Sequence, residues 1–246
     1  MRRKGFSLIE LLVVISVIAL VTVILVPALV RARQQGESMV CLNNLRQMAI
    51  AAQMYTEAFK GYYPIAQYLK MTPGKNFMYV WDFTTIYEPG KKTVVPGLLW
   101  QGRTIEKIQQ CPSFKGSANW QLDPYTGYNY NTSYIGHGQG ENIVVPAKAV
   151  VVKKPSQCAL FGDGEWENGA NKFMRAPWPN PGDLSFTGRY AGTQGYRHAG
   201  MTNVAWCDGH ASSQRELYTE TAADEKEKIA PGTGFLSRDN SAYDLK

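Results

Sequence analysis

Apolar residues are concentrated near the start of the chain. Residues 11–30 contain no charged side chain. A helix of this length rises about 30 Å, which is the thickness of the hydrocarbon core of a bilayer. Three cations at residues 2–4 precede the run, and Arg31 and Arg33 follow it. Because the larger cationic group stays on the cytoplasmic side, the pattern predicts a membrane-spanning helix with the rest of the chain exported.

A helical period continues beyond this apolar run. Apolar residues recur at spacings of three and four, which predicts one helix from about Phe6 to about Phe59. Its first part, residues 6–30, is apolar on all sides. Residues 31–60 are amphipathic and are expected to present one face to the chain's own globular part.

Three residues are expected to disturb or end this helix. Pro27 should kink it, because proline cannot donate to the carbonyl four residues back and its ring crowds that turn. Gly36 weakens it by about 1 kcal/mol. Gly61 is expected to end it, with a proline following shortly.

The remaining residues, 61–246, are expected to form one globular head. Up to Gly116, short apolar pieces alternate with turn residues, and strands and helical turns are equally compatible with the pattern. Further on, Ala147–Lys153 and Cys158–Phe161 predict strands, and Asp208-Gly209 between two apolar pieces predicts a hairpin with a type I′ turn. The predicted fold is α+β, with a long N-terminal helix packed on a C-terminal antiparallel β-sheet head.

Two other segments of the head have a marked composition. Residues 119–140 are rich in glycine, asparagine and tyrosine, and such tyrosines either bind sugar or protein or, more often, pack over a sheet. From Tyr218 onward the chain is charged, which predicts a helical turn followed by a surface tail.

Composition indicates a globular protein and argues against nucleic-acid binding. The chain is 44% hydrophobic and 19% charged, with a formal net charge of +6, of which residues 2–4 carry three. The sequence contains no Lys/Arg-rich block and no aromatic–basic motif of a nucleic-acid-binding module. No nucleic-acid partner is therefore expected.

The four cysteines are widely spaced, at Cys41, Cys111, Cys158 and Cys207. Zinc ligands usually come in close pairs, and this spacing does not favour a structural zinc site. In an exported head, an even number of cysteines permits disulfides. We predict the pairs Cys41 with Cys111 and Cys158 with Cys207, and buried free thiols are the alternative.

Glu10 is an acidic residue at the edge of the apolar run. A carboxylate in or near lipid is costly and usually has a partner. Glu10 is therefore a candidate functional residue, and the alternative is a hydrated side chain at the membrane surface.

The start of the chain resembles the type III signal of type IV prepilins and type II secretion pseudopilins. The similarity lies in the basic leader of residues 1–5, ending at Gly5, then Phe6, Glu10 and an apolar helix with Pro27 late in it. It implies that prepilin peptidase cuts after Gly5 and that Phe6 becomes the methylated N-terminus. It also implies that Glu10 neutralises the N-terminal ammonium of a neighbouring subunit, since a buried carboxylate and ammonium are costly apart and tolerable together.

A second similarity lies in the head. His198, followed after nine residues by Asp208 and Gly209, resembles the His-X9-Asp-Gly signature of a prepilin-type group. Within that group other motifs recur in a fixed order, and the chain carries them as Cys41 with Asn44–Gln47, Cys111–Ser113, Tyr128–Asn131, and Pro155 with Phe161–Asp163. Cys158 and Cys207 lie outside this pattern.

The same resemblance suggests a calcium site, because pseudopilin heads bind calcium. The candidate ligands are Asp163, Glu165 and Asp208, with His198 as a further candidate, since oxygen-rich loops suit this ion. In the alternative, Asp208 forms the turn and His198 bonds backbone groups without an ion. No cofactor other than this possible calcium is expected.

No sequence motif indicates an enzyme. The sequence has no Gly-x-Ser-x-Gly elbow, phosphate loop or His-Glu-x-x-His motif. Asp163 and Glu165 lie too close in sequence to establish the opposed carboxylates of a glycosidase.

The sequence therefore predicts a structural subunit of a type II secretion pseudopilus or a type IV pilus-like filament. Its precursor would lie in the bacterial inner membrane with the head in the periplasm, and its partners would be prepilin peptidase and homologous subunits. A membrane-anchored adhesin or glycan-binding protein is the alternative, motivated by Tyr125, Tyr128, Tyr130 and Tyr134. A secreted hydrolase anchored by the helix is the third reading.

Overall fold

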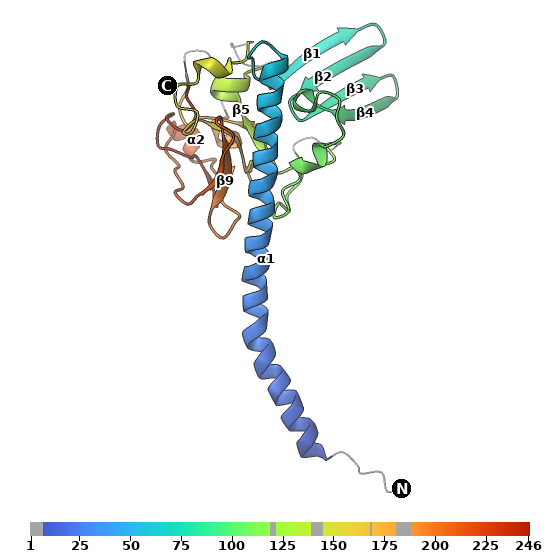
Figure 1. Cartoon of the computed structure of the whole chain (residues 1–246), viewed down its shortest axis with the longest axis vertical. Coiled ribbons are helices and arrows are strands. Elements are labelled where there is room, and N and C mark those ends of the chain that lie inside the picture. The colour runs from blue at the N-terminus through green and yellow to red at the C-terminus, as the bar shows by residue number, and fades with distance from the viewer. Residues whose placement is uncertain (1–6, 119–121, 139–144, 168, 181–187) are drawn as a thin grey trace.

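The computed structural model describes residues 7–118, 122–138, 145–167, 169–180 and 188–246. One long helix, α1 (Leu8–Ala58), carries a head of short strands around its C-terminal half. The N-terminal half extends away from the head (Figure 1). This arrangement confirms the predicted α+β, pilin-like fold.

Both ends of α1 are set by local hydrogen bonds. At the start, the Ser7 hydroxyl accepts from the Glu10 N–H, and the Glu10 carboxylate accepts from the Ser7 N–H, which is a capping box. At the end, Gly61 adopts a φ of +83° and its N–H bonds to the carbonyl of Thr56 at 2.7 Å. The predicted helix therefore agrees with the structure at both ends.

Pro27 lies inside α1 without ending it. The helix curves in its N-terminal half (Figure 1). A proline inside a helix removes one backbone hydrogen bond and favours such bending.

The C-terminal half of α1 packs on the head along one face. It contacts strands β6, β9 and β10, whose bounds are given below. Buried side chains recur at intervals of one to four residues: Cys41, Leu45, Met48, Ala49, Ala52, Tyr55 and Thr56. The predicted amphipathic half is therefore confirmed.

Two antiparallel hairpins form the first sheet. Its order is β1 (Gln67–Thr72), β2 (Lys75–Val80), β3 (Phe83–Glu88) and β4 (Lys91–Pro96). The outer turns contain Gly74 and Gly90, both with positive φ near +75°. This sheet projects to one side of α1 (Figure 1).

The second sheet lies against α1 and holds most of the core. Its order is β10 (Ala211–Gln214), β9 (Thr202–Trp206), β6 (Ala159–Gly162), β5 (Asn129–Asn131) and β7 (Phe173–Met174). All pairs are antiparallel except β5 with β7. The rings of Trp81, Tyr130 and Phe161 meet there, with centroids 5.1–5.6 Å apart.

Short elements complete the head. These are the strand pair β8 (Gln194–Gly195) and β11 (Thr233–Gly234), helix α2 (Ala223–Lys226), a π-helical turn (Thr132–Gly136), and 3-10 turns at Leu98–Trp100, Glu106–Gln109, Ala149–Val151 and Arg189–Gly192.

Three sequence predictions for the head were wrong. Ala147–Lys153 is not a strand: it contains the 3-10 turn Ala149–Val151, and the Ala149 N–H bonds to the carbonyl of Gly61 at 2.8 Å. The C-terminus is not a surface tail, because Phe235 and Tyr243 are fully buried. Apolar residues of this C-terminal segment pack against Ala159 of β6 and Val204 of β9.

The third wrong prediction concerns the turn of the β9–β10 hairpin. Only Gly209 has a positive φ there, and Trp206 pairs with His210 across three loop residues. This is a type I turn followed by a left-handed glycine, and not a type I′ turn. Both central residues have positive φ in a different turn, Ala199-Gly200, which connects His198 to Met201.

Candidate functional site

The first candidate site is the N-terminal half of α1, which has no packing partner in the described chain. Every residue from Leu8 to Val30 is exposed. The most apolar 18-residue window of α1 has a mean hydropathy of 3.1, and none of it is buried. In the part of the chain that the structure describes, α1 is the one helix long and apolar enough to cross a membrane.

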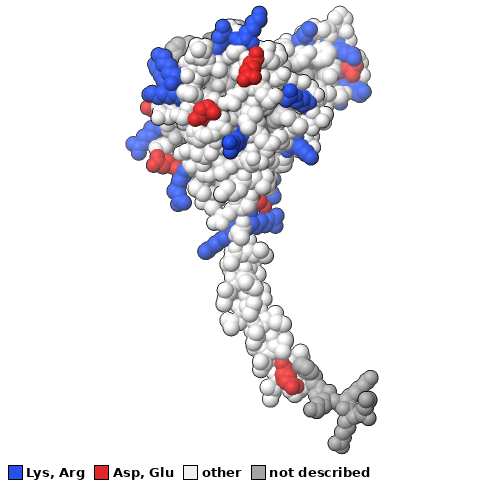
Figure 2. Space-filling model, viewed as in Figure 1, with Lys and Arg blue, Asp and Glu red and all other residues white. Residues whose placement is uncertain are grey.

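The polar groups of this half are satisfied within the helix. The hydroxyls of Ser16 and Thr22 donate to the carbonyls of Val13 and Ile18, at 2.8 and 2.7 Å. Figure 2 shows the charged side chains gathered on the head and an uncharged stretch of helix below it. Such a surface suits lipid or the apolar helices of other subunits, because it leaves no side-chain polar group without a partner.

Glu10 lies at the N-terminal end of this uncharged stretch, in the first turn of α1. It is the third residue of the helix, where a carboxylate is favoured by the positive end of the helix dipole. One of its oxygens, Oε2, accepts from the Ser7 N–H at 2.8 Å. The Ser7-x-x-Glu10 spacing is the sequence signal of a capping box, and the sequence analysis missed it. Gly5 and Phe6, the predicted processing residues, lie outside the described residues.

A second candidate site lies inside the head, where four buried side chains from distant segments meet. We call it the buried thiol cluster. Its sulfur, carboxylate and imidazole ligand atoms all lie within 4.8 Å of one another. It consists of Cys41, Cys111, Asp163 and His198, whose relative exposures are 0–2%.

Each member of the cluster is positioned by a different element. Cys41 lies on the buried face of α1, and Asp163 directly follows β6. Cys111 follows a 3-10 turn and packs against Gly127, where a Cβ would lie 2.7 Å from the Cβ of Cys111. His198 is held by the tight Ala199-Gly200 turn.

The four side chains contact one another directly. The sulfurs of Cys41 and Cys111 are 3.7 Å apart, and the Cys41 thiol lies 3.1 Å from Asp163 Oδ1. His198 Nε2 lies 3.1 Å from Asp163 Oδ2 and 3.8 Å from the Cys111 sulfur.

Arg197 and Tyr128 complete the surroundings of the cluster. Arg197 Nε donates to the Cys111 sulfur at 3.3 Å, and its Nη2 contacts Asp163 Oδ1 at 3.0 Å. The Tyr128 hydroxyl donates to the Cys41 sulfur at 3.2 Å. The sequence analysis did not assign Arg197 or the Tyr128 hydroxyl to a site, because nothing in their local sequence indicates these partners.

Charges alternate through the cluster. Burial opposes ionisation of the Cys111 thiol, but the hydrogen bond with Cys41 and the charge of Arg197 lower its pKa to about 5. Burial also disfavours the imidazolium of His198, yet its contacts with Asp163 and Cys111 raise its pKa to about 9. Burial and the neighbouring Cys111 raise the pKa of Cys41 well above its usual value. At neutral pH one thiolate and one carboxylate thus face two cations.

The predicted disulfide pairs are neighbours, but the structure shows all four cysteines as free thiols. The separation of Cys41 and Cys111 exceeds a disulfide bond of about 2.05 Å. Cys158 and Cys207 lie on adjacent strand ends, where the Cys207 N–H bonds to the carbonyl of Cys158 at 3.0 Å. Both disulfides, Cys41 with Cys111 and Cys158 with Cys207, stay predictions.

The structure brings two of the three predicted calcium ligands together. Asp163 and Glu165 both bind Arg197. Asp208 lies on the partly exposed β9–β10 turn, where its Oδ1 accepts from the backbone N–H of His210 at 3.1 Å. Asp208 therefore stabilises the turn, and the ring of His198 contacts Asp163. Calcium binding stays a prediction.

The Tyr-rich segment packs into the head. Within its described residues, Tyr128 and Tyr130 are buried, and Tyr125 and Tyr134 are half-buried. The Tyr130 hydroxyl donates to the carbonyl of Pro64 at 2.9 Å. These tyrosines therefore support the core, which removes the observation that motivated a glycan-binding reading.

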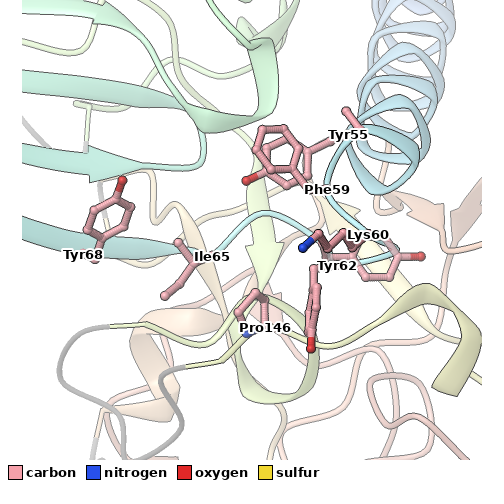
Figure 3. A pocket seen from close by; sticks show the side chains of 9 residues that line it. Tyr55, Phe59, Lys60, Tyr62, Ile65, Tyr68 and Pro146 are labelled. Carbon is pink, nitrogen blue, oxygen red and sulfur yellow. The ribbon is translucent and has the colours of Figure 1, made fainter.

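An open aromatic pocket of about 430 Å³ lies where α1 joins the head (Figure 3). The ring of Tyr55, on the last turn of α1, stacks at 4.0 Å on that of Phe59, which directly follows the helix, and Tyr68 of β1 also lines the pocket. Lys60 is the charged residue among its lining side chains.

Comparison with known proteins identifies the start of the chain. Residues 1–26 match the family model described as the prokaryotic N-terminal methylation motif. This motif is the prepilin-type signal, so the chain carries such a signal, and the matched residues include Gly5, Phe6 and Glu10. Together with the long N-terminal helix, it indicates a type IV pilin- or pseudopilin-like protein.

The match does not extend into the head. No curated protein and no solved structure shows significant similarity to the chain. The similarity to the His-X9-Asp-Gly group therefore stays a prediction.

Proposed function

We propose that the chain is a structural, non-enzymatic subunit of a type II secretion pseudopilus or a type IV pilus-like filament. Prepilin peptidase would cut after Gly5 and methylate Phe6. Before assembly, the precursor would span the inner membrane with its head outside the cytoplasm. The finished filament would lie in the periplasm or at the cell surface.

The observation that carries this proposal is the unequal packing of α1. Its C-terminal half is fixed in the head, whereas its N-terminal half exposes apolar side chains on every side. Lipid covers such a surface in the membrane, and only other apolar helices replace lipid outside it. A helix bundle formed by several copies or homologues of the chain meets this requirement.

Glu10 has a specific role in this assembly. Moving the apolar half from lipid into a helix bundle buries the new N-terminal ammonium of each subunit, and that charge needs a partner. The Glu10 carboxylate of a neighbouring subunit supplies one. Because this pair forms only between subunits, it also sets their axial register.

Substitution of Glu10 tests this role. We expect Glu10→Ala to remain in the membrane and to keep a folded head, because the hydrogen bonds of Glu10 with the described residues go to Ser7 and none reaches the head. It should fail to form filaments, which electron microscopy of sheared material would show. Glu57→Ala is the matched control, since Glu57 is an exposed carboxylate at the other end of α1.

A third variant separates the carboxylate from helix capping. Ser7→Ala breaks the same capping box and keeps the Glu10 carboxylate. We expect Ser7→Ala to assemble. Normal filaments from Glu10→Ala, or equal defects in Ser7→Ala and Glu10→Ala, would contradict the proposed role.

A further inference from the structure

We propose that the buried thiol cluster is a tetrahedral zinc(II) site that fastens α1 to the head. Its ligands are the side chains of Cys41, Cys111, Asp163 and His198. Two thiolates, one imidazole and one carboxylate are a donor set that zinc takes in proteins.

The distances approach those around a tetrahedral ion. Zinc bonds of about 2.0–2.3 Å place tetrahedral ligand atoms about 3.3–3.8 Å apart. The Cys111 sulfur lies 3.7 Å from the Cys41 sulfur and 3.8 Å from His198 Nε2, whereas the two oxygens of Asp163 lie slightly closer, at 3.1 Å from the Cys41 sulfur and from His198 Nε2. One ligand atom from each of the four residues lies within 4.8 Å of the other three, so an ion placed among them would be close to all four.

The surroundings of the two sulfurs also fit metal-bound thiolates. Arg197 donates to the Cys111 sulfur and Tyr128 donates to the Cys41 sulfur. Donors of this kind support anionic sulfur in the outer shell of a metal site. Asp163 is oriented in the same way, by the backbone N–H of Asn203 at 2.7 Å.

Formal charges nearly balance in the metal-bound site. Two thiolates and the carboxylates of Asp163 and Glu165 carry four negative charges, and zinc(II) with Arg197, which binds both carboxylates, carries three positive charges. His198 binds as a neutral imidazole. Protons on the ligand atoms leave to solvent when the metal enters, as for other thiolate sites.

A disulfide between Cys41 and Cys111 fits the same contacts less well. The sulfurs would have to approach from 3.7 Å to about 2.05 Å. After disulfide formation, the Arg197 cation and the Tyr128 hydroxyl would donate hydrogen bonds to uncharged sulfurs. Asp163 and His198, which contact the same two sulfurs, would take no part in the disulfide bond.

The site joins segments that are far apart in the chain. It would connect α1, the segment after the second 3-10 turn, the end of β6 and the turn before β9. Zinc would thus lock the amphipathic half of α1 onto the head from inside. This role is independent of filament assembly, so either proposal can fail alone.

Cobalt(II) substitution tests the site in the full chain in detergent. After treatment with a chelator, Co²⁺ added alone should give thiolate-to-cobalt charge-transfer bands and the intense visible bands of a tetrahedral complex. Zn²⁺ should abolish both at a one-to-one ratio. Zinc should also raise the midpoint of thermal unfolding.

Three variants locate the binding. We expect Cys111→Ser to weaken zinc binding by more than about 100-fold, and Tyr128→Phe to weaken it by about 10–100-fold through the lost outer-shell bond. Cys158→Ser, which alters a buried thiol outside the cluster, should bind as the unmodified chain does. If Cys111→Ser does not fold, the cobalt spectrum of the unmodified chain and Tyr128→Phe still decide.

Three results would overturn the proposal. One is the absence of tetrahedral cobalt bands in the folded chain. Another is an equal loss of metal in Cys158→Ser. The third is a Cys41–Cys111 disulfide in peptides from the protein isolated from cells under non-reducing conditions.

Discussion

The two halves of α1 differ in what covers them, although they form one continuous helix. Leu45 and Met48 in the C-terminal half are fully buried against the head, whereas Val17 and Ile18 in the N-terminal half are more than half exposed. The head covers the apolar face of the C-terminal half. The apolar side chains of the N-terminal half have no such cover in the described chain, so they need a partner outside it. An apolar surface of this extent needs lipid or other subunits.

The largest effect on stability is expected when a buried side chain in the C-terminal half of α1 is shortened. Leu45→Ala should lower the free energy of unfolding of the head by about 2–5 kcal/mol, because it leaves a cavity in a fully buried site. All six tryptophans lie in residues 81–206, so intrinsic fluorescence in denaturant reports on the head alone.

Val17→Ala is the matched control in the exposed half. It removes apolar atoms that touch no part of the head, so head unfolding should not change. If Val17→Ala destabilised the head as much as Leu45→Ala does, the N-terminal half would also contribute to head stability, which contradicts the comparison.

A smaller effect is expected where the two halves join. Gly36 is exposed, and a Cβ added there would meet no atom within 4 Å. Gly36→Ala should raise the stability of α1 by about 0.4–1 kcal/mol through the unfolded state. Helix content from circular dichroism at rising temperature measures this, with Gly61→Ala as the contrast, since its φ of +83° disfavours alanine. A destabilising Gly36→Ala would indicate a hinge function at this position.

The sequence was most informative where local rules decide the structure. The three-and-four spacing predicted α1 and its buried face, and Gly61 predicted its end. The β9–β10 hairpin was also predicted, but not its turn type, because Asp-Gly is compatible with a three-residue loop as well.

These local rules could not predict that the residues of the buried thiol cluster meet. Its members are separated by as many as 157 positions, and no local pattern shows that they meet. The spacing rule for zinc considers ligands in close pairs, whereas the four members of the cluster come from separate segments. The buried C-terminus was missed for a related reason, because Phe235 and Tyr243 stand in very short apolar pieces, Phe235-Leu236 and Ala242-Tyr243, within a largely polar stretch.

The N-terminus of the protein recovered from cells tests the central claim most directly. Mass spectrometry of the N-terminal peptide identifies the first residue and any methyl group on it. The account predicts a chain that begins at N-methylated Phe6. A protein in assembled filaments that still begins at Met1 would contradict it.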